Sequence, residues 1–131
     1  MDLFTGNYFI TILNKLINST GGIENIKNYF YDFLTFTNEN GKYKGCLLTN
    51  TINELDVEKN EILLTKISDF ANTIQQIFVK VLRRNNNFSE TDVHVVSNHL
   101  LVSLQGLSVA SKSLKEQQLK DFIEMTFKIY I

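Results

Sequence analysis

Few side chains in this sequence have the type and spacing that chemistry requires. His94 and His99 are five residues apart, whereas a helical zinc site needs histidines at i and i+4. Cys46 is the single cysteine; it could serve as a redox sensor only where exposed and activated, so a small buried hydrophobic residue is the ordinary interpretation. The carboxylates between Glu54 and Glu61 suit a helix N-terminus. With no nucleophile elbow, Walker loop or dinucleotide fingerprint, we expect no enzyme, no metal and no cofactor.

The composition predicts one ordered domain over residues 1–131. Hydrophobic residues make up 44% and charged residues 21%, which excludes a disordered chain. A net charge of -1 leaves no basic surface for phosphates. No stretch reaches the roughly 18 uninterrupted apolar residues of a membrane span, and the N-terminus lacks signal-peptide features. We therefore expect a cytoplasmic protein without a membrane partner.

Helical periodicity dominates the chain, which contains no proline. Ser89 with Asp92, and Ser113 with Glu116, have the spacing of helix N-terminal caps. We predict an all-α fold, a bundle of about six antiparallel helices without strands. The predicted helices cover Leu3 to Ile17, Ile23 to Phe36, Cys46 to Leu55, Leu63 to Val81, Val93 to Ala110 and Leu119 to Tyr130.

The last two predicted helices carry apolar residues on two sides, so they must be covered on two sides. The sides of these helices that face away from the core would together form a larger apolar patch than monomers usually expose. A homodimer in which the two helices of each copy form a two-fold four-helix bundle would cover this patch. A glycine in the middle of a helix, such as Gly106, lowers helix stability by about 1 kcal/mol relative to alanine. Close approach between two helices at this position would compensate for that loss. The predicted interface residues are Leu101, Leu104, Gln105, Leu107, Phe122, Thr126, Phe127 and Tyr130.

Two short runs carry a family resemblance. Gly45-Cys46-Leu47-Leu48, with Asn50 and Glu54-Leu55-Asp56 after it, resembles the sixth helix of tetracycline-repressor (TetR) family regulators. The helix containing Gln105-Gly106-Leu107 is similar to their eighth. The resemblance extends over essentially the whole chain and implies the C-terminal ligand-binding and dimerisation domain, whose last two helices form the dimer contact. It also implies that DNA is bound only through a helix-turn-helix head, which would precede Asp2-Leu3-Phe4 and is absent from these residues.

Such a domain would bind a hydrophobic or amphipathic small-molecule effector in a cavity between its helices. We expect apolar and aromatic residues on inward faces to line it, with a few polar residues to orient the ligand; for any one aromatic, plain core packing is the alternative. The predicted ligand-binding residues are Phe9, Leu13, Tyr29, Phe30, Phe33, Leu48, Asn50, Ile52, Phe70, Ile74, Phe78, His99 and Ser103.

The function that we expect is regulation of transcription by a repressor. Effector binding would shift the first helix, which would connect to the DNA-binding head, and so release operator DNA. The alternative is a helical protein–protein interaction or dimerisation module without a small-molecule ligand, which a filled core would favour. An enzyme ranks third, because nothing pairs a nucleophile with a base.

Overall fold

The chain folds into helices throughout the part that the computed structural model describes, which is residues 3–39, 61–84 and 87–131. The elements are α1 (Leu3–Ile17), α2 (Ile23–Glu39), α4 (Glu61–Leu82), α5 (Glu90–Ala110) and α6 (Glu116–Lys128), and these ranges contain no strand. The all-α prediction is confirmed. The predicted short helix from Cys46 to Leu55, and with it the Gly45–Leu48 run, lies outside the described residues.

Local hydrogen bonds explain where the last two helices begin. The Ser89 side chain accepts a hydrogen bond from the Asp92 N–H at 3.1 Å, so the predicted cap of α5 is confirmed. The predicted cap at Ser113 is wrong, because the Ser113 N–H donates to the Ala110 carbonyl and closes the last turn of α5. α6 begins after Lys115 instead, whose N–H donates to the Gln118 side chain at 2.9 Å.

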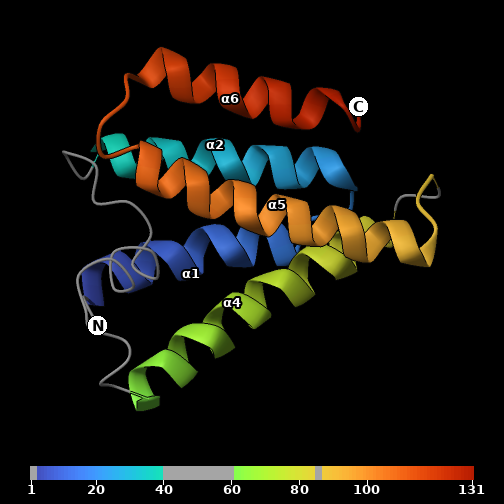
Figure 1. Cartoon of the computed structure of the whole chain (residues 1–131), viewed down its shortest axis with the longest axis horizontal. Helices are drawn as coiled ribbons and strands as arrows, with labels where there is room; N and C mark the ends of the chain where they lie inside the picture. The colour runs from blue at the N-terminus through green and yellow to red at the C-terminus, as the bar shows by residue number, and fades with distance from the viewer. Residues whose placement is uncertain (1–2, 40–60, 85–86) are drawn as a thin grey trace.

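α2 lies at the centre of the bundle, packed against α1, α4 and α6, and α5 packs against α4 and α6 (Figure 1). Phe30 of α2 meets Phe127 of α6 edge to face, with ring centroids 4.9 Å apart. Tyr29 meets Phe78 of α4 in the same way at 6.0 Å. These rings are at most 1% exposed, so aromatic packing around α2 forms the centre of the core.

The relation of α1 to α4 differs from that of the other neighbours. Residues at the C-terminal ends of the two helices are joined by hydrogen bonds from Arg84, which follows α4. Toward their N-terminal ends the two helices separate (Figure 1). α1 therefore packs mainly along α2 and diverges from α4.

Candidate functional site

The most distinctive surface of the molecule is apolar and lies on α5 and α6. On α5, Val95, Val102 and Val109 are exposed, and each is seven residues from the next, so they form one stripe along the helix. On α6 the exposed apolar residues are Phe122 and Met125, and Ile129 follows directly at its C-cap. We call these six residues, together with exposed Gly106, the α5–α6 surface.

The two stripes of the α5–α6 surface meet at a small pocket of about 190 Å³. Gly106 of α5 and Phe122 of α6 both line this pocket. Its other walls are apolar apart from one glutamine, and they comprise Leu107, Ala110, Leu114, Gln118 and Leu119. The surface therefore contains a depression that links α5 to α6 at the end nearest the turn between them.

Electrostatics set this surface apart from an ordinary solvated face. The residues from Val93 to Ala110 include no Asp, Glu, Lys or Arg. Val102 is 67% exposed and Ile129 77% exposed. Exposed sides of helices in monomeric proteins usually carry charges, and contiguous apolar patches mark interaction sites. A partner could therefore cover the α5 part of this surface without removing water from any Asp, Glu, Lys or Arg of α5 after Asp92.

Gly106 is not explained by packing within the chain. A Cβ atom added there would meet no atom within 4 Å apart from its own helix and chain neighbours. A mid-helix glycine costs about 1 kcal/mol relative to alanine, and no contact inside this chain compensates for it. If a helix approaches Gly106 closely, as we predicted, that helix must therefore belong to a partner outside the chain.

The structure divides the predicted dimer residues between the core and the surface. Leu104, Leu107, Thr126 and Phe127 are buried within this chain, so they present no surface to a second copy. Phe122 is 39% exposed, and the three half-buried residues are Leu101, Gln105 and Tyr130.

Sequence reasoning missed most of the α5–α6 surface. It left Val95, Val102, Val109, Met125 and Ile129 out of the predicted interface, although all five are exposed. The seven-residue spacing of the three valines was the available signal. A helix that is apolar all round does not show from its own sequence which side faces the core.

The predicted ligand residues gather in the core, where most pack against each other. Those that are buried are Leu13, Tyr29, Phe30, Phe33, Ile74, Phe78 and Ser103. Phe70 is half-buried, and His99 is exposed with its Nδ1 2.6 Å from the Tyr130 hydroxyl. The side chain of Phe9 and the residues Leu48, Asn50 and Ile52 lie outside the described residues.

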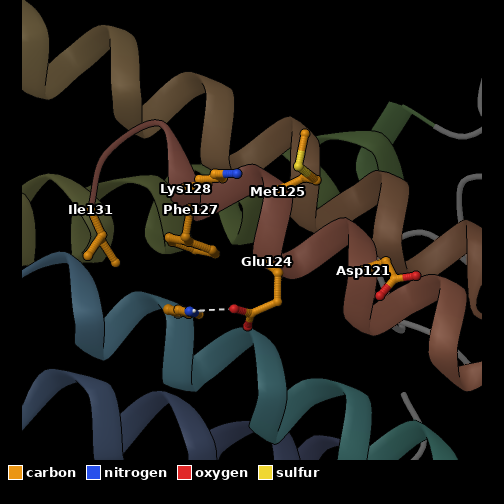
Figure 2. Close-up of a pocket in the computed structure, with 7 residues that line it drawn as sticks. Asp121, Glu124, Met125, Phe127, Lys128 and Ile131 are labelled. Atoms are coloured by element: carbon orange, nitrogen blue, oxygen red, sulfur yellow. Dashed lines mark hydrogen bonds and ion pairs between the residues drawn. The ribbon is translucent and has the colours of Figure 1, made fainter.

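Two open grooves border the core. One, of about 240 Å³, lies between α1 and α2 and includes Tyr29, a predicted ligand residue, beside the Lys15–Asp32 ion pair. The other is larger, about 570 Å³, and runs between α2 and α6 (Figure 2). Its lining residues are Lys27, Asp121, Glu124, Met125, Phe127, Lys128 and Ile131.

A polar network crosses the larger groove and joins α2 to α6. Lys27 Nζ lies 3.0 Å from Glu124 Oε1, an ion pair marked by the dashed line in Figure 2. The Tyr31 hydroxyl donates to Glu124 Oε2. Burial, reinforced by the bond to Glu124, raises the pKa of Tyr31 to about 12. The Tyr31 hydrogen bond, followed by that of Lys27, lowers the pKa of Glu124. The network therefore stabilises the neutral phenol and the ionised carboxylate.

This network predicts how stability depends on pH. Because folding raises the pKa of Tyr31 from 10.0 to about 12, its contribution is complete below pH 10 and is lost as the pH rises toward 12. We expect the stability difference between wild type and Tyr31→Phe to be constant up to pH 10 and to shrink by pH 12. Urea unfolding across this range measures the difference. In the Glu124→Gln background the pH dependence of this stability difference should be smaller but should persist, because burial, the largest cause of the raised pKa of Tyr31, is retained. A pH dependence of unchanged size would contradict the network.

Metal and membrane sites receive little support from the described residues. Within residues 3–39, 61–84 and 87–131, no three His, Cys, Asp or Glu side chains are grouped so as to hold a metal. Over the same residues, α5 is the one helix long and apolar enough to cross a membrane. Core helices of soluble proteins meet this criterion too, and α5 packs on α4 and α6.

Comparison with known proteins identifies no relative. The sequence matches no protein-family model, no curated protein and no solved structure. The chemistry that the candidate site offers is recognition by an apolar surface.

Proposed function

We propose that this chain is the dimerising and effector-sensing domain of a TetR-type transcriptional repressor. The observation that carries the proposal is the α5–α6 surface, a set of exposed apolar residues on the last two helices whose α5 part, from Val93 to Ala110, contains no Asp, Glu, Lys or Arg. The resemblance of the Gly45–Leu48 and Gln105–Leu107 runs to that family implies a dimer contact on the same two helices.

A second copy of the chain is the partner that this surface suits best. A two-fold arrangement would place α5 and α6 of one copy against α5 and α6 of the other, so each stripe would cover its own equivalent. The valine stripe supplies side chains and the pocket beside Gly106 supplies a depression. Burying such residues stabilises a complex by about 25 cal/mol per Å² of apolar area before the cost of association.

The sensing part of the proposal concerns α1 and α4. A hydrophobic or amphipathic molecule bound between the helices would change the position of α1, the helix that would connect to a DNA-binding head. In a dimer this movement alters the separation of two recognition helices, which must match half-sites about 34 Å apart. The molecule needs only to bind one of the two arrangements more tightly.

Native mass spectrometry of the chain purified from cells tests both parts together. The proposal predicts a dimer that retains the additional mass of a small apolar molecule. A dimer without added mass, together with no shift in melting temperature across a panel of apolar small molecules, would remove the sensing part. A monomer would remove the dimerisation part.

Gly106→Ala is expected to affect folding and association in opposite directions. The added methyl meets no atom within 4 Å in the chain outside its own helix and neighbours, so helix propensity should stabilise the monomer by about 1 kcal/mol. The same methyl would crowd a second copy, and overpacking of about 1–3 kcal/mol corresponds to a dissociation constant raised between about fivefold and about a hundredfold. Urea unfolding of a monomeric background and sedimentation of the dimer measure the two effects. Tighter association would contradict the close approach at Gly106.

The second candidate is a helical protein–protein interaction module that binds no small molecule. The density of the aromatic core favours it, since Phe30, Phe33 and Phe78 are 0% exposed and Phe30 is packed directly on Phe127. Both candidates use the α5–α6 surface. They differ only in whether a ligand binds, which the mass measurement decides.

A further inference from the structure

Two consecutive arginines follow α4 and have different surroundings. Arg83 is exposed and pairs with Glu90 at the start of α5. Arg84 is half-buried and reaches back to the end of α1 and the turn after it. Its guanidinium donates to the Ser19 carbonyl, to Ser19 Oγ at 3.2 Å and to the Gly21 and Ile17 carbonyls at 3.3 and 3.4 Å.

These acceptors lie at the C-terminus of α1, where Ile17 is the last helical residue, and in the turn that follows it. The last carbonyls of an α-helix have no intrahelical donor, and the helix dipole makes that end negative. A guanidinium offers five N–H donors in a rigid plane, so one side chain can serve several carbonyls together. Arg84 does this across more than 60 residues of sequence, since its contacts to Ser19, Gly21 and Ile17 span 65, 63 and 67 positions.

The position of this contact in the bundle gives it a mechanical consequence. α1 and α4 are joined at the Arg84 end and separate toward their N-terminal ends (Figure 1). α1 packs mainly on α2, so the Arg84 contact is its principal polar attachment to the end of α4 among the described residues. A change in the angle between α1 and α4 would therefore move the separated end most and leave the joined end in place.

We propose that Arg84 is a positioning residue that holds the C-terminal end of α1 against α4 as a fixed pivot. Movement of α1 is then a rotation about Ser19, largest at its N-terminal end. The assignment of this rotation to effector signalling rests on the proposed function; the pivot itself does not. Arg83 serves as the matched control, because it adjoins Arg84 in sequence but forms only a surface ion pair with Glu90.

Hydrogen exchange tests the attachment in the chain as it exists. In Arg84→Gln we expect the Asn18 and Ser19 amides, which close the last turn of α1, to exchange about tenfold or more faster, because bonds to a charged donor are lost. Exchange in α5 and α6 should change less than about twofold. Arg83→Gln should leave Asn18 and Ser19 unchanged, and Arg84→Lys should fall between. Faster exchange throughout the chain would show only a general loss of stability and would overturn the proposal.

Electron–electron distance measurements test the pivot directly. Spin labels at Ile10→Cys of α1 and Ser68→Cys of α4, in a Cys46→Ser background, report the separation of the diverging parts; both sites are exposed. Labelled chain is diluted with unlabelled chain so that only distances within one copy contribute. Arg84→Gln should broaden the distance distribution and Arg83→Gln should not. If Arg84→Gln leaves the distance distribution unchanged, the pivot is overturned, whether or not the chain dimerises. If the wild-type chain is a monomer, the proposed function is removed, but the distance measurement still tests the pivot.

Discussion

Replacing Val102 with glutamate should convert a dimer of this chain into a folded monomer. Val102 is 67% exposed in the single chain and lies at the middle of the valine stripe. A two-fold contact would bury two new carboxylates without partners, which costs about 3–5 kcal/mol and raises the dissociation constant more than about a hundredfold. Light scattering coupled to size-exclusion chromatography measures the masses of the wild-type chain and of Val102→Glu at the same concentration.

The matched control for Val102→Glu is Ile10→Glu, which places the same charge at another exposed apolar residue. Ile10 is 57% exposed and belongs to α1, outside the α5–α6 surface. Ile10→Glu should leave the dimer intact. Far-ultraviolet circular dichroism checks that both variants keep their helices. A Val102→Glu protein that remains a dimer would place the contact on some other surface.

Phe78→Ala should have the largest effect on folding among single truncations in the aromatic core. Phe78 is fully buried in α4 and lies against Tyr29 and Phe30, with ring centroids 6.0 and 6.4 Å away. Removing a buried phenylalanine side chain loses its transfer free energy and leaves a cavity, so the free energy of unfolding should fall by about 3–5 kcal/mol. Urea unfolding followed by circular dichroism measures it, with Val102→Glu as the monomeric background.

Phe70→Ala is the comparison for Phe78→Ala, because Phe70 lies on the same helix and is only half-buried. We expect it to cost clearly less. If Phe78→Ala cost under about 1 kcal/mol, the surrounding rings would have to collapse readily into the space. That result would contradict a densely packed centre and favour an adaptable cavity there.

The helix limits were largely readable from the sequence. α1 covers Leu3–Ile17 as predicted, because Ser19 to Gly22 interrupts an otherwise regular apolar period. The cap at Ser89 was also predicted and places the start of α5 at Glu90. Both follow from local rules, since caps and periodicity depend on residues within a few positions of each other.

The orientation of helices was not readable in the same way. α5 is apolar on nearly every side, so its own sequence did not show that Leu104 and Leu107 face the core while Val95 and Val102 face solvent. That choice depends on which surfaces α4 and α6 present to it. The contact of Arg84 with α1 was not predicted for a related reason: a basic residue at the end of a helix is ordinarily assigned to the dipole of its own helix, whereas Arg84 serves the end of a different one.

Sedimentation equilibrium of the wild-type chain over a range of concentrations tests the central claim most directly, because the α5–α6 surface either is or is not covered by a second copy. We predict a mass of twice the chain's 15.1 kDa that persists at low micromolar concentration. A single-chain mass at every concentration would contradict the account and leave the surface to a partner of different sequence.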